Sequence, residues 1–212
     1  FMNTEKIEKD GINPILGDLA KVEKIVDAMS LIATISELEI YGGPSIFGSY
    51  IYPDVGNSTQ YAIYIYQGGL SLPDEAYYRE DQYAPIREAF IEHVKKMSEL
   101  SGIKIDADSL LKLETKIAGF HWDQVKDRDA IATYNKKSLA ELKALSPHID
   151  WDIYVSAGQI EPSKFQEVVV REPSFFEGLS SILGDFDVEA WRNWLRFHIL
   201  SGAAAYLNEA LV

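Results

Sequence analysis

The chain has 212 residues, of which 47% are hydrophobic and 25% charged, and it contains no cysteine. These fractions are typical of globular domains, so general disorder and low-complexity classes are excluded. Its 33 acidic residues outnumber the 20 basic ones, and the net charge of −13 disfavours binding to nucleic acid or to an anionic membrane surface. Without cysteine the chain can form neither disulfides nor thiolate metal sites, and we expect a reducing compartment.

Both ends of the sequence suggest a piece of a longer protein. Phe1 precedes Met2, and the first residues lack the basic and apolar segments of a signal peptide. Residues 201–212 still follow a helical pattern, without a capping Gly or Asn. We therefore expect a chain truncated at both ends. No apolar run reaches the roughly 20 residues that a membrane-spanning helix needs.

Residues 13–39 have the pattern of one amphipathic helix. Asn13-Pro14 supplies a cap and a first-turn proline, and apolar residues then recur every three or four positions as far as Ile35. Gly42-Gly43-Pro44 ends the segment. The spacing predicts a single helix, possibly preceded by a short turn.

Residues 46–67 predict a β-hairpin. Two runs rich in aromatic and β-branched residues, 46–52 and 60–66, flank the turn-forming segment 53–59. Both faces of the hairpin are apolar, so we expect other elements to cover each side and Tyr64 and Ile65 to be buried.

Capping residues and apolar spacing indicate several further helices. In the helix that starts at Pro85, we expect Ile86, Phe90, Val94 and Met97 to face the core. The last helix has an apolar stripe that reaches Tyr206. The predicted helices span about 74–79, 85–101, 106 or 108 to 118, 138–145, 173–184 and 187 onward, and 168–170 is strand-like. The sequence thus predicts a mainly α fold with one embedded β-hairpin.

The sequence contains no self-contained active site. No two histidines have the His-Glu-x-x-His spacing of a zinc site, and the glycines of residues 43–49 lack the lysine of a phosphate-binding loop. We interpret His198, beside the apolar stripe, as a hydrogen-bonded structural histidine. The four histidines are His93, His121, His148 and His198.

Two further groups of residues have a functional and a structural interpretation. Asp123, Asp127 and Asp129 could suggest a calcium loop, but the central Gly and terminal Glu are missing, so a solvated charged face is favoured. The hairpin tyrosines could form a stacking platform for a sugar or peptide, or pack inside the fold; the absence of polar residues between them favours packing. They are Tyr50, Tyr52, Tyr61, Tyr64 and Tyr66.

Residues 67–78, Gln-Gly-Gly-Leu-Ser-Leu-Pro-Asp-Glu-Ala-Tyr-Tyr, resemble the Gly-Leu-x-Leu-Pro-x-x-x-Tyr-Tyr stretch of the neprilysin and endothelin-converting-enzyme family of zinc metallopeptidases. Further segments agree in order and spacing, so the resemblance covers essentially the whole chain. They are residues 1–4 with 11–15, 113–118, 127–129, 133–141, 168–170 before Pro173, and 191–200.

The resemblance implies that residues 1–212 are part of the amino-terminal, mostly helical lid region of such a peptidase. That region caps the active site and restricts the size of the peptide substrate. The zinc and its ligands would lie in the catalytic domain, which this chain lacks, so no catalytic, cofactor-binding or metal residue is assigned here. The chain would be inactive alone, and its partners would be that domain and peptides of limited size.

The resemblance also bears on location, and one alternative to it stays open. Secreted members carry a Cys shortly after the Tyr-Tyr pair, whereas Arg79-Glu80-Asp81 follows here, so a cytoplasmic bacterial enzyme is expected and a secreted one is less favoured. The alternative is a stand-alone helical module that binds a protein or peptide and has no catalytic activity.

Overall fold

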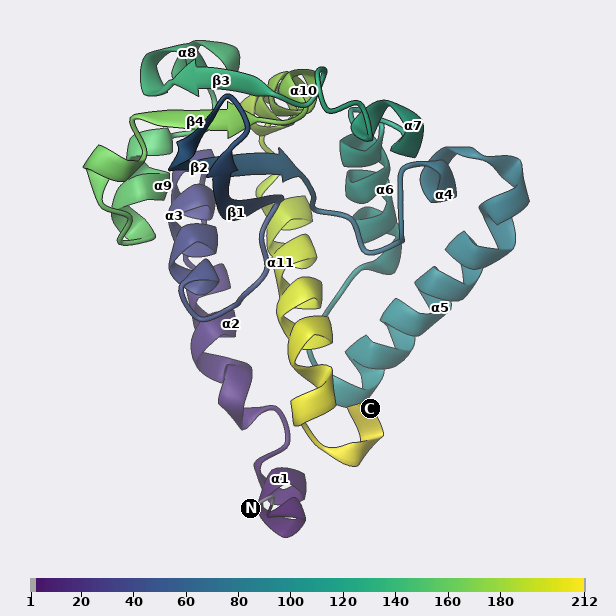
Figure 1. The fold of residues 1–212 in the computed structure, drawn as a ribbon. Helices are drawn as coiled ribbons and strands as arrows, with labels where there is room; N and C mark the ends of the chain where they lie inside the picture. The colour runs from purple at the N-terminus through teal and green to yellow at the C-terminus, as the bar shows by residue number, and fades with distance from the viewer. Residues whose placement is uncertain (1–2, 212) are drawn as a thin grey trace.

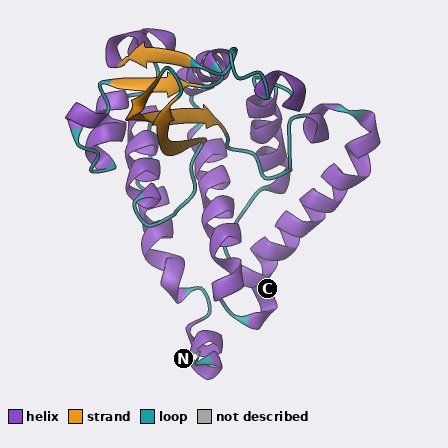
Figure 2. Ribbon diagram, in the orientation of Figure 1, coloured by secondary structure: helices purple, strands orange, loops and turns teal. Residues whose placement is uncertain are grey.

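The computed structural model describes residues 3–211, which form a mainly α fold with one small sheet (Figures 1 and 2). The long helix α11 runs through the middle, between α2 and α3 on one side and α5 and α6 on the other (Figure 1). The sheet lies across one end of these helices. The helices are α1 (Thr4–Asp10), α2 (Leu16–Val22), α3 (Ala28–Glu39), α4 (Ala76–Arg79), α5 (Ala84–Ser101), α6 (Ala107–Ala118), α7 (Gln124–Asp127), α8 (Leu139–Leu145), α9 (Trp151–Ala157), α10 (Pro173–Gly184) and α11 (Val188–Ala203).

The predicted hairpin is present, as part of a four-stranded sheet in the order β1-β2-β4-β3. Strands β1 (Phe47–Asp54) and β2 (Asn57–Gln67) pair antiparallel, and β4 (Glu167–Val170) lies parallel to β2. Strand β3 (Asn135–Ser138), which the sequence did not predict, closes the sheet antiparallel to β4. The strand-like run predicted at 168–170 is confirmed as part of β4, and β3 is the strand that the prediction lacked.

The prediction that both faces of the hairpin are covered holds only for the half next to β4. Tyr64 is 4% exposed and Ile65 is fully buried, as expected. Near the turn, however, Ile51 is 71% and Tyr61 76% exposed. Strand β4 is only four residues long, so it extends the covered sheet over part of β2 and leaves the tip of the hairpin in solvent.

The single helix predicted for residues 13–39 was wrong, because the segment is a 3₁₀ turn followed by two helices. Helix α2 ends at Val22, and Asp27 starts α3 with a capping box formed with Ser30. The guanidinium of Arg192 in α11 donates to the carbonyls of Glu23 (2.9 Å) and Ile25 (3.0 Å). These bonds satisfy carbonyl groups that the break leaves without a helical partner.

Most of the predicted caps are confirmed. Asp106 and Asp187 each accept a hydrogen bond from a first-turn amide, and Ser138 and Glu141 form the expected capping box. Asp150 begins α9, a helix that the sequence analysis did not predict. In α5 the core face is confirmed for the buried Phe90, Val94 and Met97 but wrong for Ile86, which is 40% exposed.

The final helix is shorter than the sequence pattern suggested. Helix α11 ends at Ala203, and two 3₁₀ turns, Ala204–Tyr206 and Glu209–Leu211, follow. Tyr206 is 80% exposed and so does not continue the buried stripe. The predicted helix also included Val212, which lies outside the described residues, as do Phe1 and Met2.

One core joins the sheet to the helices. Phe47 at the start of β1 packs against Trp151, Tyr154 and Phe176, with ring centroids 5.1–5.5 Å apart. Trp191 and Trp194 of α11 are buried, as expected. None of the helices described by the structure is long and apolar enough to cross a membrane.

Candidate functional site

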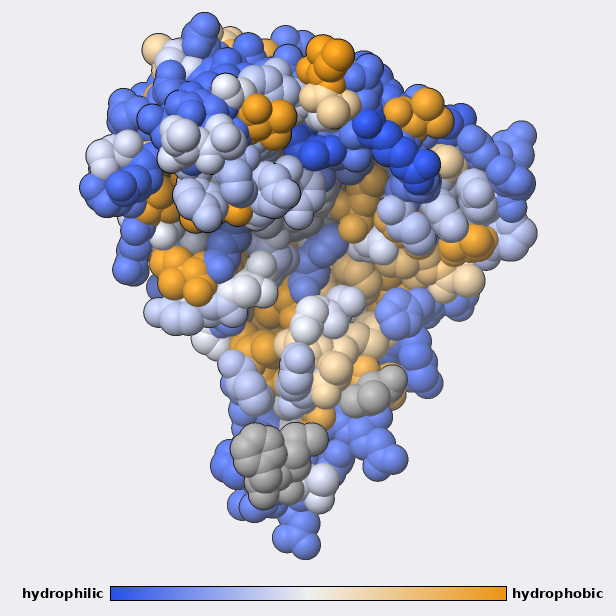
Figure 3. Space-filling view, in the orientation of Figure 1, coloured by the Kyte–Doolittle hydropathy of each residue, from blue (hydrophilic) through white to orange (hydrophobic). Residues whose placement is uncertain are grey.

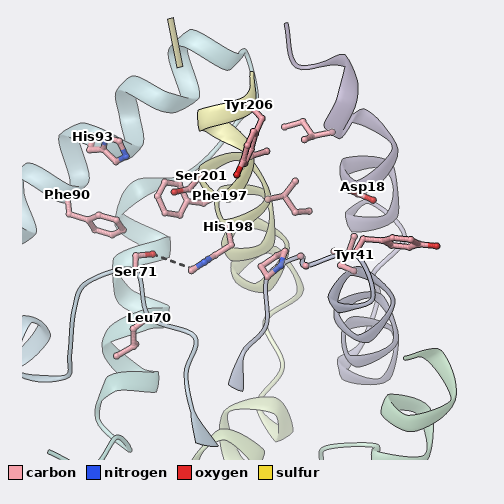
Figure 4. Close-up of a pocket in the computed structure, with 18 residues that line it drawn as sticks. Asp18, Tyr41, Leu70, Ser71, Phe90, His93, Phe197, His198, Ser201 and Tyr206 are labelled. Carbon is pink, nitrogen blue, oxygen red and sulfur yellow. Dashed lines mark hydrogen bonds between the residues drawn. The ribbon is translucent and has the colours of Figure 1, made fainter. Parts of the chain in front are cut away.

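A hollow lies between α11, α5 and the end of α3 (Figure 4). The segment after β2, which includes Leu70 and Ser71, forms one wall of this hollow. Its volume is about 720 Å³. In the space-filling view, apolar side chains gather in the hollowed region below the sheet (Figure 3). Labelled lining residues are Asp18, Tyr41, Leu70, Ser71, Phe90, His93, Phe197, His198, Ser201 and Tyr206.

Glu114 of α6 is fully buried behind this wall and fixes its main chain. One carboxylate oxygen, Oε2, accepts from the amide of Ser71 (3.0 Å) and from the hydroxyl of Tyr78 (2.5 Å). The Tyr78 oxygen in turn accepts from the amides of Ser71 and Leu72. These contacts give the tyrosine after the Gly-Leu-x-Leu-Pro stretch a structural role, because its hydroxyl bonds to main-chain amides within that stretch.

The carbonyl groups of Gly68 and Gly69 in the wall are each bonded by a side chain from another part of the fold. The ring Nε2 of His121 lies 2.9 Å from the carbonyl oxygen of Gly68, and Trp194 Nε1 donates to the carbonyl of Gly69 at 3.1 Å. Gly69 has φ +82°, a conformation that side-chain-bearing residues rarely adopt. The wall is therefore fixed by side chains from α6, α11 and the loop after α6.

Ser71, His198 and Glu114 lie together, but they do not form a catalytic triad. A triad requires the serine and the carboxylate to bond to different nitrogens of the histidine. Here the same nitrogen, His198 Nε2, lies 2.9 Å from Glu114 Oε1 and 3.4 Å from Ser71 Oγ. Ser71 Oγ also donates directly to Glu114 at 2.7 Å. The hydrogen-bonded, structural interpretation of His198 is confirmed.

A second buried carboxyl, Glu172, secures the other end of the wall. Its Oε2 accepts from the amide of Gln67 at 2.8 Å, and Oε1 accepts from Arg171 Nε at 3.2 Å. Burial is the main cause that raises the pKa of Glu172, to about 8, and the neighbouring Asp127 adds to the effect. Arg171 also bonds to Asp127 (3.0 Å), whose pKa is lowered by hydrogen bonds despite its partial burial. The raised pKa favours the protonated form of the Glu172 carboxyl over the charged one.

The acidic residues of the 123–129 segment lie on a largely exposed charged face and also make local hydrogen bonds. Asp123 caps α7 by accepting from the amides of Val125 and Lys126. Asp127 pairs with Arg171, and Asp129 accepts from the amides that follow it. Asp123 and Asp129 are exposed, as the prediction of a solvated charged face requires, and Asp127 is partly buried.

The hairpin tyrosines divide between the two interpretations. Tyr64 is buried and stacks on Tyr50, with centroids 5.1 Å apart and planes 5° from parallel. Tyr52 and Tyr61 are 57% and 76% exposed, so the packing interpretation was wrong for them. Alternation alone could not show this, because the covering strand β4 is short.

The residues that the structure describes do not fit a zinc site. Across residues 3–211, no three His, Cys, Asp or Glu side chains are placed to hold a metal ion. Tetrahedral catalytic zinc needs about three protein ligands. His93 and His148 are exposed, His148 bonds to Ser180, and His121 and His198 lie in the wall contacts above. The sequence analysis assigned no contact with the wall to Glu114, His121 or Glu172, because no local pattern distinguishes them from ordinary polar residues.

The fold and the site define a class of protein region: mainly α, with a concave apolar face and without a metal centre of its own among the described residues. A family model described as Peptidase family M13 matches residues 1–212, and the chain belongs to that family. Its amino-terminal part is the one represented here, as the resemblance to neprilysin and the endothelin-converting enzymes predicted.

Solved structures and characterised relatives of this chain support the same family. The chain is 34% identical to the Mycobacterium tuberculosis zinc metalloprotease Zmp1, in a crystal structure with an inhibitor, with a TM-score of 0.93 over 98% of this chain and 33% of that one. PepO of Lactobacillus rhamnosis shares the fold, with a TM-score of 0.77 at 16% identity, over 98% and 34% of the two chains. Endothelin-converting enzyme 1 of Cavia porcellus is 24% identical over 97% of this chain and 28% of its own length. The chain thus spans about a quarter to a third of these relatives.

Proposed function

We propose that this chain is part of a zinc metalloendopeptidase that hydrolyses peptides, and that it covers the active site and limits the size of the substrate. The observation that carries the proposal is the concave face with its fixed wall. A hollow of about 720 Å³, lined mainly by apolar and small residues, suits a surface that encloses a peptide. Excluding bulk water from a reaction site is a known contribution of such covers.

The length of the relatives and the composition of the site support this division of labour. The relative with 34% identity is a zinc metalloprotease about three times as long as this chain. Residues 3–211 offer no cluster of metal ligands. The metal would therefore be held by the catalytic domain of the same protein, with this chain as its cover. A cytoplasmic bacterial location is part of the proposal and rests on the absence of cysteine.

Narrowing the hollow tests the proposal in the full-length protein. A Cβ atom added at Gly202 in α11 meets no atom within 4 Å, and Gly202 lines the hollow, so Gly202→Phe adds bulk at this face. We expect the variant to cleave short peptides normally and long peptides more slowly than the wild type does. Gly17→Phe is the matched control, because Gly17 is helical, has equal space and does not line the hollow.

Two results would contradict the proposal. If chelator-sensitive hydrolysis is absent from the full-length protein at every peptide length, the chain belongs to a binding module rather than an enzyme. If Gly202→Phe and Gly17→Phe change cleavage of all lengths alike, this face does not limit substrate size.

A further inference from the structure

Strand β1 is an end strand of the sheet, so no strand among the described residues pairs with its outer edge (Figure 2). Residues 49–52 are all exposed to solvent. An uncovered edge presents main-chain amides and carbonyls that another extended chain can pair with. Which groups point outward can be derived from the contacts of β2.

The odd-numbered residues of β2 direct their main-chain groups toward β4. Gln67 donates its amide to Glu172, and the carbonyl of Ile65 accepts from the amide of Arg171 at 2.9 Å. Both the Gln67 amide and the Ile65 carbonyl therefore point to the side of β2 away from β1. In an antiparallel pair, a residue whose groups point away from its partner strand faces a residue that also points away. The β1 residues opposite Gln67 and Ile65 therefore direct their groups to the free edge.

Phe47, Ser49 and Ile51 are those outward-pointing residues of β1. The hydroxyl of Ser45 donates to the carbonyl of Phe47 at 2.5 Å and accepts from its amide at 3.4 Å, so Phe47 is already satisfied. Pro53, the next outward position, has no amide hydrogen, as is usual for proline at a sheet edge. Ser49 and Ile51 are left as the two outward amide donors, a template for a short strand.

A cavity adjoins this edge at its Phe47 end. It has a volume of about 420 Å³ and is lined by β1 together with α3 and α9. Glu39, at the end of α3, and Ser49 both line it. Tyr66 and Tyr154 also face the cavity, and Glu39 is its one carboxylate. Burial raises the pKa of Glu39, because the charged form is poorly solvated there. A cation brought beside this carboxylate would compensate its charge.

We propose that an extended peptide adds to the sheet along β1, pairing with the main chain of Ser49 and Ile51 and placing its free amino terminus beside Glu39. Ser45 blocks pairing beyond Ser49, so the added strand ends at the cavity. The end of a chain that suits a carboxylate is the amino terminus. An amino terminus at the Phe47 end of β1 requires the peptide to run parallel to β1.

This inference rests on the proposed function, since the peptide it places is the substrate of the peptidase. It adds a preference that the hollow does not supply: a free amino group on the substrate. Main-chain pairing supplies affinity with little dependence on sequence, as in other cases of strand addition. Pairing along β1 therefore changes the affinity for the peptide and not the rate of the chemical step.

The test measures the binding of peptides labelled at the carboxyl terminus to the full-length protein, in chelator so that none is cleaved. Two peptides of one sequence are compared, with a free or an acetylated amino terminus. We expect the free amine to bind about tenfold more tightly, the factor of one charge-assisted hydrogen bond. Glu39→Gln should abolish this preference. Glu37→Gln, an exposed carboxylate on the same helix, should retain it.

The pairing itself is tested at Ile51. Ile51→Pro removes an outward amide that makes no bond within the sheet, and should weaken both peptides about tenfold. Ile51→Ala keeps that amide and should bind both as the wild type does. Equal binding of the two peptides to the wild type overturns the proposal, without relying on any variant. Binding with the free-amine preference but no hydrolysis after zinc is restored would instead overturn the proposed function and leave the strand site standing.

Discussion

Tyr78 and Glu114 are joined by a hydrogen bond of 2.5 Å that links α4 to α6 behind the wall of the hollow. Tyr78 is 5% exposed and Glu114 fully buried. The pKa of Tyr78 is raised, first by burial and then by the Glu114 charge, so the phenol is a permanent donor. Its oxygen also accepts from Ser71 and Leu72, and one hydroxyl thus organises both ends of the 71–78 segment.

Removing that hydroxyl should destabilise the protein. Tyr78→Phe leaves two amides without this acceptor and Glu114 with one donor fewer, which costs about 1–3 kcal/mol. Tyr77→Phe is the matched control, because Tyr77 contributes mainly by stacking on Tyr83 with centroids 4.1 Å apart. Urea unfolding measures the difference. Equal stability of the two variants would show that the network does not hold the wall.

Glu172 should make the stability fall as pH rises. Its pKa is raised to about 8 in the folded protein, against an ordinary value near 4.5, so the folded state binds the extra proton between these values. The stabilisation is fully present below about pH 4.5 and is lost as pH rises toward 8, by at most about 1.4 kcal/mol per pH unit.

The variant Glu172→Gln tests this pH dependence, because its amide mimics the protonated carboxyl. We expect its stability to decline less than that of the wild type between pH 5 and pH 8. Glu177→Gln on the exposed face of α10 should follow the wild-type curve. The assignment is wrong if Glu172→Gln keeps the full wild-type slope.

The two halves of the hairpin should respond differently to truncation. Ile65 is fully buried, so Ile65→Ala should cost about 2–5 kcal/mol through the cavity it leaves. Ile51 is 71% exposed, and Ile51→Ala should change the free energy of unfolding by less than about 0.5 kcal/mol. Thermal unfolding of the two variants compares them. Similar losses would mean that the tip of the hairpin is covered.

Local signals predicted much of the fold. Asp106, Ser138 and Asp187 start helices where capping chemistry indicated, and Pro85 lies in the first turn of α5. The break between α2 and α3 was missed because the apolar spacing continues through it. What stabilises the break is Arg192, more than 160 residues away along the chain.

The remaining elements depend on contacts that no local pattern contains. Strand β3 has the polar sequence Asn-Lys-Lys-Ser and is a strand because it pairs with β4. Glu114 occupies one position of a charged helix. It becomes a buried acceptor only through tertiary contacts with Ser71, Tyr78 and His198.

The central claim is that this chain covers the active site of a zinc peptidase and does not contain it. The most direct measurement is chelator-sensitive hydrolysis of a quenched peptide, by the full-length protein and by residues 1–212 alone. Because catalytic zinc needs about three ligands and an open position, we predict turnover by the full-length protein and none by the chain alone. Stoichiometric zinc with chelator-sensitive turnover in the isolated chain would contradict the account.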